Sequence, residues 1–109
     1  MSTGVLWREA LDAFVAGLRL EYGARLEDLV LYGSRARGDA GDDADIDTLV
    51  VLNPLGDFWE ELSRIAPLAS RVSLEFGVVI SAIPIDAAEL RHPRTPLAIN
   101  AAREGVLIK

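Results

Sequence analysis

The chain has 109 residues, the size of one domain, and its 17 acidic against 11 basic residues give a formal net charge of −6. This balance argues against a broad nucleic-acid-binding face, which needs a surplus of Lys and Arg, so we expect no direct nucleic-acid binding. The lack of cysteine and the single histidine, His92, exclude disulfides, thiolate metal sites, cysteine nucleophiles and histidine-rich zinc sites.

Targeting and membrane signals are not apparent in the sequence. The first residues, MSTGVLWREALDAF, lack the charged start followed by an apolar run that marks a signal peptide. No stretch reaches the roughly 18–20 apolar residues that a membrane helix requires. We therefore expect a cytoplasmic protein with one domain over residues 1–109 and no membrane contact.

The first third of the chain predicts a helix, a strand and a tight turn. Apolar residues at helical spacing predict a helix from Val5 to Tyr22, with Gly23 as its C-cap. Leu29–Tyr32 is a short apolar run typical of a buried strand. It leads directly into Gly33-Ser34, which we expect to turn the chain into a helical turn at residues 35–37.

The middle of the chain predicts a second strand and a long helix. After a polar loop at residues 39–43, a strand is predicted at Ile46–Leu52, ended by Asn53-Pro54. A helix is predicted at Phe58–Leu74, which Pro67 is expected to kink or divide.

The last third predicts short elements. They are a strand at residues 78–85, a turn at Ala87–Leu90 with Asp86 as N-cap, a loop at residues 91–96, a helix at Leu97–Arg103 before Gly105, and an edge strand at residues 106–108. The alternating order predicts a small α/β sandwich with the sheet on one side and the helices on the other.

An acidic pair stands at the start of the second strand. Asp45 and Asp47 are two residues apart, so their side chains share a face of the strand, with Cα atoms roughly 6.5–7 Å apart. Two carboxylates aimed at one volume repel each other unless a cation lies between them. Oxygen ligands at this spacing suit Mg²⁺ or Mn²⁺, although exposed strand-edge acids are the alternative interpretation.

The turn after the first strand suits a phosphate. Gly33 lets the chain turn sharply and lets a phosphate approach the backbone, whose N–H groups point outward at such a place. The Ser34 hydroxyl can donate one more hydrogen bond. Arg35 and Arg37 are candidates to neutralise phosphate oxygens, with a solvated surface position as the alternative for one of them.

Two other motifs, the Walker A loop and the EF-hand loop, do not match the sequence. Gly33 and Gly38 have Walker A spacing, but Asp39-Ala40 stands where Lys-Ser/Thr is required. The series of aspartates from Asp43 resembles an EF-hand loop, but Thr48 replaces the required glycine and Pro54 the bidentate glutamate.

Gly33-Ser34, ten intervening residues and Asp45-Ile46-Asp47 match the G-S-x10-D-x-D signature of the minimal nucleotidyltransferase (MNT) family. This family is part of the DNA-polymerase-β-like superfamily. The segment GSRARGDA and residues 96–105 also resemble it, and the element order agrees over nearly the whole chain. The resemblance implies an α/β (α+β) fold of polymerase-β-like type, with a small mixed β-sheet packed on helices.

The resemblance also implies a function. Family members bind Mg²⁺ (or Mn²⁺) with an NTP, usually ATP, and transfer the nucleoside monophosphate to a hydroxyl. By resemblance, Gly33 and Ser34 hold the β- and γ-phosphates, and Asp45 and Asp47 hold the metal. Minimal members commonly pair with a small helical HEPN-type protein as the antitoxin of a toxin–antitoxin module, by complex formation or by adenylylating the toxin.

One departure from the family pattern concerns a third carboxylate, which active members carry on the later strand. Ser81 aligns with that place, and the nearest acids, Glu75 and Asp86, lie outside the middle of the strand. Two hypotheses therefore stand: an ATP-dependent protein nucleotidyltransferase, or a catalytically impaired module that neutralises its partner by binding. Ala44, where the family often has serine, predicts only a lost hydrogen bond.

The remaining candidates have plain structural interpretations. His92 is expected in a surface loop, Trp7 and Trp59 in the core or a subunit interface, and Tyr32 in the core at a strand end. The other acids of the loop, Asp39, Asp42 and Asp43, are expected to be solvated. Half of the residues are hydrophobic, which in so short a chain predicts an exposed apolar face and hence a homodimer or a partner complex.

Overall fold

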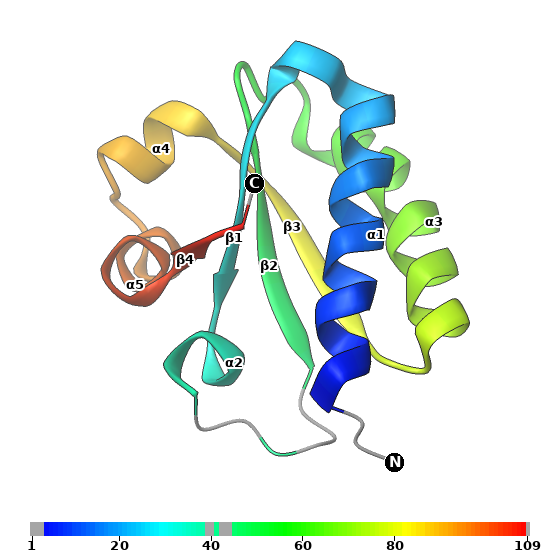
Figure 1. Ribbon diagram of the computed structural model, residues 1–109. Coiled ribbons are helices and arrows are strands. Elements are labelled where there is room, and N and C mark those ends of the chain that lie inside the picture. The colour runs from blue at the N-terminus through cyan, green and yellow to red at the C-terminus, as the bar shows by residue number, and fades with distance from the viewer. Residues whose placement is uncertain (1–3, 39–40, 42–44, 109) are drawn as a thin grey trace.

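A four-stranded sheet is the frame of the molecule in this computed structural model, which describes residues 4–38, 41 and 45–108 (Figure 1). The elements, in chain order, are α1 (Gly4–Tyr22), η1 (Gly23–Arg25), β1 (Leu26–Tyr32), α2 (Ser34–Arg37), β2 (Ile46–Leu52), α3 (Phe58–Phe76), β3 (Ile80–Asp86), α4 (Ala87–Arg91), α5 (Pro96–Glu104) and β4 (Val106–Leu107). No helix within these ranges is long and apolar enough to cross a membrane.

The strands lie in the order β3-β2-β1-β4. β1 is antiparallel to β2 and to β4, whereas β2 is parallel to β3, so the sheet is mixed, as the sequence resemblance implies. The short β4 adds to the outer edge of β1, which confirms the predicted edge strand after the last helix.

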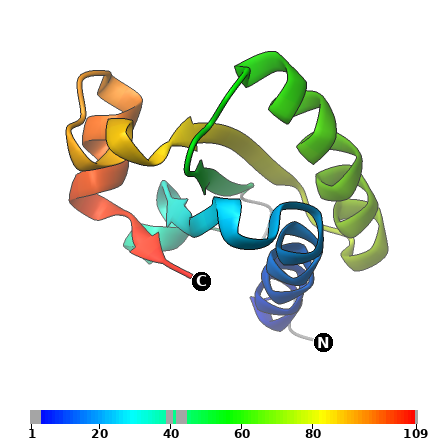
Figure 2. The same cartoon turned by 90° about the horizontal axis from the view of Figure 1, so that it is seen from above.

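Helices cover both faces of the sheet, which corrects the prediction of a sandwich with helices on one side only (Figure 2). Along β2, Ile46, Val50 and Leu52 pack into a core with α1 and α3. Leu49 and Val51 point to the opposite face and pack into a second core with α4 and α5. Alternating side chains of a strand point to opposite faces, and the unbroken apolar run of β2 reflects burial on both of them.

The bounds of β2 are those predicted from the sequence, whereas β1 begins earlier. Leu26 pairs with Leu52 and is 1% exposed, so the strand starts three residues before Leu29. The polar Glu27 and Asp28 hid this extension, because a register irregularity between Leu26 and Asp28 interrupts the regular alternation there.

Pro67 does not divide α3, which runs as one helix of 19 residues, contrary to one of the two predicted effects. A proline removes the hydrogen bond to the carbonyl four residues earlier, here Ser63. Pro67 and Ser63 are both exposed, so water can hydrate that carbonyl. Firm ends also stabilise the helix, because the Asp57 side chain accepts from Glu60 N at 2.9 Å and Gly77 ends it in a left-handed conformation.

A buried carboxylate links α1, η1 and α3. Glu61 is 5% exposed and accepts from the Arg25 guanidinium at 2.8 Å and from the Tyr22 hydroxyl at 3.0 Å. Arg25 also donates to the carbonyls of Pro54 and Leu55. Burial works to raise the pKa of Glu61, but the hydrogen bonds from Arg25 and Tyr22 and the positive charges of Arg25 and Arg64 outweigh it and hold this pKa below its usual value.

Glu61→Gln is expected to lower the free energy of unfolding at pH 7 by about 2 kcal/mol, because the amide keeps the shape but loses the charge-assisted bonds. A carboxyl whose pKa is lower in the folded state stabilises above its unfolded pKa, and this contribution fades as pH falls through the folded value. Urea unfolding at several pH values should therefore show a gap between the two proteins at pH 7 that narrows on acidification below pH 4.5, the usual pKa of Glu. A gap independent of pH contradicts this account.

Candidate active site

Three neighbouring strands bring three polar side chains into one row. In the register of the sheet, Tyr32 of β1 lies opposite Asp47 of β2, and Asp47 lies opposite Ser81 of β3. Paired residues of neighbouring strands point to the same face. Asp47 is two residues from Leu49, so the row lies on the sheet face of the second core, beyond the part that Leu49 packs against α4 and α5.

Asp45 completes an acidic pair with Asp47. Asp45 is exposed and directly precedes β2, and Asp47 is half-buried within it. Burial and then the negative charge of Asp45 raise the pKa of Asp47 above its usual value. Burial, followed by the charge of Asp47, also raises the pKa of Tyr32. The two carboxylates therefore act on one small volume, as the sequence spacing predicts.

The turn at Gly33 touches this pair. Gly33 has φ 74° and ψ −154°, a conformation that side chains strongly disfavour. A Cβ at this position would lie 2.6 Å from Asp47 Oδ2, so there is room for a hydrogen but not for a side chain. Ser34 follows as the first residue of α2, and the Gly33 carbonyl accepts from Arg37 N at 3.1 Å. The predicted phosphate turn and the predicted metal ligands are thus in direct contact.

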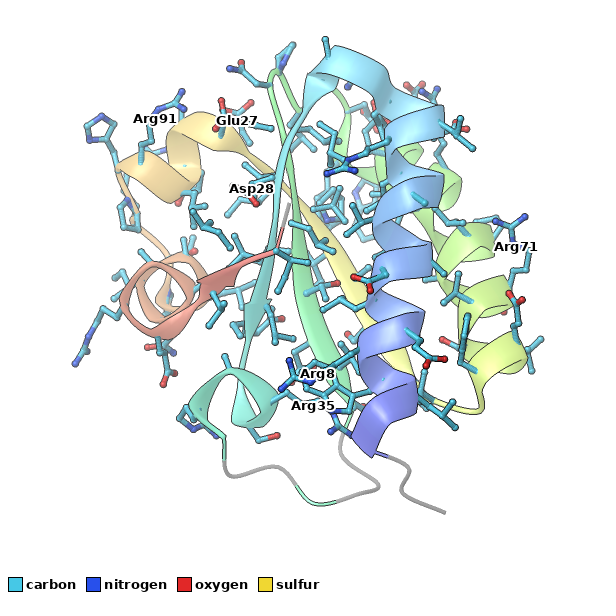
Figure 3. The ribbon with its side chains drawn as sticks, viewed as in Figure 1. Arg8, Glu27, Asp28, Arg35, Arg71 and Arg91 are labelled. Atoms are coloured by element: carbon cyan, nitrogen blue, oxygen red, sulfur yellow. The ribbon has the colours of Figure 1, made fainter. Side chains whose placement is uncertain are left out.

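The two candidate arginines point away from each other. The Arg35 guanidinium lies 5.0 Å from the centre of the Trp7 ring on α1 (Figure 3). This places the Arg35 head group beside α1, which covers the face opposite to Asp47. Arg37 lies 3.5 Å from the carboxylate of Glu104 on α5. The fold therefore directs Arg35 to a partner on α1 that no pattern in the sequence indicated.

The two acids considered as substitutes for a third carboxylate, Glu75 and Asp86, lie outside the row of polar side chains. Glu75 is exposed on α3. The Asp86 carboxylate accepts from Leu55 N and Ala88 N, both at 2.9 Å, and these two hydrogen bonds lower its pKa. Asp86 thus caps α4, as predicted, and neither acid lies opposite Asp47, where Ser81 lies. The part of the chain that the structure describes holds no group of three or more His, Cys, Asp or Glu side chains that could bind a metal.

The donor set of the pair fits a hard divalent cation. Asp45 and Asp47 offer only oxygen atoms, which Mg²⁺ and Mn²⁺ prefer. Burial and, after it, the charge of Asp45 raise the pKa of Asp47, and a cation between the two carboxylates would relieve their repulsion. Mg²⁺ is commonly held by one or two carboxylates together with substrate phosphates, so the adjacent Gly33 turn completes a suitable arrangement.

Some of the remaining predicted positions agree with the structure and others do not. His92 is exposed just after α4, and Tyr32 packs at the end of β1, both as expected. Trp7 packs against the first core, whereas Trp59 is 72% exposed, which rules out the core and leaves a subunit interface as the expectation for it. Three acids of the polar loop, Asp39, Asp42 and Asp43, lie outside the described residues.

Comparison with known proteins agrees with this geometry. A family model described as a nucleotidyltransferase domain matches residues 14–108. Two proteins of Methanocaldococcus jannaschii, provisionally named protein adenylyltransferases, are similar to the chain. MJ0604 is 37% identical over 82 residues, covering 75% of each protein, and MJ0141 is 36% identical over 59 residues, covering 54% of this chain and 59% of that protein.

Solved structures share the fold. A provisionally named nucleotidyltransferase from Sulfolobus solfataricus has a TM-score of 0.61 at 21% identity, covering 94% of this chain and 75% of that one. A provisionally named minimal nucleotidyltransferase has a TM-score of 0.61 at 22% identity, covering 99% of this chain and 97% of that one. A toxin–antitoxin structure with AMP-PNP has a TM-score of 0.58 at 21% identity, covering 86% and 68%. The family match over residues 14–108 and the 37% identity to MJ0604 show that the chain belongs to the nucleotidyltransferase domain family.

Proposed function

We propose that the protein transfers a nucleoside monophosphate, AMP from ATP, to a hydroxyl group of a partner protein. The observation that carries this proposal is the contact between the Gly33 turn and Asp47, because it joins a phosphate-binding turn to a carboxylate pair suited to a divalent cation. The similarity to two relatives named as protein adenylyltransferases supports ATP as donor and a protein as acceptor.

Each residue has a distinct role in the proposed reaction. The backbone of Gly33 and the Ser34 hydroxyl hold the β- and γ-phosphates, while Asp45 and Asp47 hold Mg²⁺ or Mn²⁺. The cation would neutralise charge on the phosphates and on the leaving pyrophosphate. The acceptor hydroxyl oxygen forms a bond to the α-phosphorus and gives up its proton to water, the bond from the α-phosphorus to the oxygen that bridges the α- and β-phosphates breaks, and pyrophosphate leaves. Arg37, exposed near α5, serves as a phosphate neutraliser if it exchanges Glu104 for the ligand.

The partner is proposed to be a small helical HEPN-type protein, for which this chain is the cytoplasmic antitoxin. The structural likeness to a toxin–antitoxin complex supports a protein partner. Two exposed apolar side chains, Leu20 and Trp59, are candidates for the contact with this partner or with a second copy of the chain.

A second candidate function is neutralisation of the partner by binding alone. The observation that favours it is the pairing of Asp47 with Ser81, because a serine supplies no charge for a second metal ion or for proton removal. Under this alternative, Asp45→Asn still neutralises the partner.

Label transfer from ATP tests the proposal. The purified protein is incubated with Mg²⁺ and a lysate of its source organism, once with ATP labelled at the α-phosphate and once with ATP labelled at the γ-phosphate. A protein band labelled only from the α-position establishes nucleotidyl transfer and gives the size of the acceptor. Absence of α-label from every band, despite nucleotide binding, favours the binding-only function.

Ser81→Asp is expected to raise the rate of label transfer about tenfold, because it places a third carboxylate opposite Asp47. Ser81→Asn is the matched control, since it has a similar size but no charge, and it should leave the rate low. The measurement is the initial rate with α-labelled ATP at saturating Mg²⁺. A rate that falls equally in both variants contradicts the assignment of this position as the missing carboxylate.

A further inference from the structure

An apolar groove begins one pleat away from the carboxylate pair. Asp47 and Leu49 point to the same face of β2, and Ser81 and Ile83 point to that face of β3. Successive residues on one face of a strand lie about 6.5–7 Å apart. Leu49 and Ile83 are themselves register partners, so together they form the near end of the groove floor.

The groove has the size and lining of a small-molecule site. Its volume is about 670 Å³, within the roughly 300–1,000 Å³ typical of such pockets. Beyond Leu49 and Ile83, apolar walls come from the connection after β2 and the start of α3, and from the start of α5. These walls include Leu55, Phe58 and Leu97.

The polar side chains that line the groove are already engaged. Asp86 accepts from two backbone N–H groups. Glu89 accepts from the backbone N–H of Arg94 and from its guanidinium, at 3.2 and 3.3 Å. The Thr95 hydroxyl accepts from Ala98 N at 3.2 Å. The groove therefore offers apolar surface to a ligand, with its polar groups held in internal contacts.

We propose that this groove holds the base of the nucleotide whose phosphates lie at the carboxylate pair, and that it grips the base by its ring faces with little selection among bases. This assignment rests on the proposed function. The ribose joining the α-phosphate to the base bridges a gap of one pleat. Since the lining carboxylates and the Thr95 oxygen already accept hydrogen bonds within the chain, and the Arg94 side chain is 86% exposed to solvent, discrimination among bases should come mainly from shape and apolar contact, which are worth far less than hydrogen-bond readout.

An acceptor peptide fits the groove less well than a base. A peptide laid against these apolar walls would bury backbone N–H and C=O groups without partners, which is costly. A planar base buries two apolar ring faces and keeps its polar edges toward the open, solvent-facing side of the groove.

The test compares ATP, GTP and inorganic tripolyphosphate, each with Mg²⁺, by isothermal titration calorimetry. Ile83→Asn should weaken ATP and GTP about tenfold and leave tripolyphosphate unchanged, because only the nucleotides reach the groove. Leu97→Asn, at the opposite wall, should have the same effect. It replaces Ile83→Asn in the test if that variant has a low melting temperature. Leu74→Asn is the matched control on the exposed surface of α3, where Leu74 is 83% exposed, and should change nothing. Wild-type affinities for ATP and GTP should agree within about tenfold.

Other results overturn the assignment in distinguishable ways. The base does not lie in the groove if both groove variants fold and bind ATP with wild-type affinity. The same conclusion follows if the affinities for ATP and for tripolyphosphate fall equally. If the groove variants bind ATP normally but lose label transfer, the groove binds the acceptor protein and not the base. A preference for ATP over GTP of a hundredfold or more refutes weak base selection. If wild type binds neither ATP nor tripolyphosphate, the proposed function itself fails, and the groove assignment fails with it.

Discussion

Asp47→Asn is expected to reduce label transfer from α-labelled ATP about a thousandfold, equivalent to about 4 kcal/mol of transition-state stabilisation, without lowering the melting temperature. The activity falls because an amide is a poor ligand for Mg²⁺ and leaves Asp45 to hold it alone. Stability is preserved or raised because the substitution removes a half-buried charge that faces Asp45. Burial and Asp45 raise the pKa of Asp47, so the ionised side chain costs folding free energy at every pH above its usual value of 3.8.

The measurements are the initial transfer rate and thermal unfolding at pH 7, without and with Mg²⁺. Glu75→Gln, a neutralised acid on the exposed surface of α3, is the control and should alter neither quantity. Added Mg²⁺ should raise the melting temperature of wild type and of Glu75→Gln but not of Asp47→Asn. A retained transfer rate would show that Asp47 is not a metal ligand of the reaction, and a lower melting temperature would contradict the expected cost of its charge.

Gly33→Ala is expected to reduce transfer about a hundredfold, because the new Cβ would lie 2.6 Å from Asp47 Oδ2 and must displace that oxygen. A misplacement of about 1 Å at a reacting centre costs roughly this factor. The backbone conformation of Gly33 adds strain of about 1–3 kcal/mol for a residue with a side chain. The transfer rate and the affinity for Mg²⁺ are the quantities to compare with wild type.

Gly38→Ala separates these two causes. Gly38 also has a positive φ, 80°, but a Cβ there would meet no atom of the described residues within 4 Å. Gly38→Ala should therefore lower stability while leaving the transfer rate of the folded protein nearly intact. Equal losses of activity in the two variants would show that backbone strain, rather than displacement of the carboxylate, is responsible.

The sequence predicted the local parts of the site well because they follow from short-range rules. The apolar run of β2, the breaker Asn53-Pro54 after it and the spacing of Asp45 and Asp47 place two carboxylates at one end of a strand. The glycine at position 33 signals a turn that other residues do not make easily. Register then brings these two features together, which the sequence resemblance implied but local pattern alone does not specify.

The features that the sequence did not predict depend on packing between distant segments. Helices on the second sheet face could not be foreseen from the element order, because α4 and α5 are short and the residues that they bury fully are alanines. The side-chain direction of Arg35 depends on Trp7, 28 positions earlier in the chain. The apolar groove is lined from β2, β3, α3, α4 and α5, so no single stretch of sequence contains it.

Because side chains alternate along β2, the strand register that buries the core residues also sets the positions of the two aspartates. The residues that fill the first core, Ile46 among them, alternate with the aspartates that face the proposed substrate. A slip of one residue against β1 would turn Asp47 into the first core and move Ile46 to the half-buried polar row, at a cost that is large beside the stability of a domain of this size. A chain in the wrong register therefore unfolds and does not persist as a folded but inactive molecule. Any loss of the proposed activity under destabilising conditions should therefore follow the loss of folded molecules.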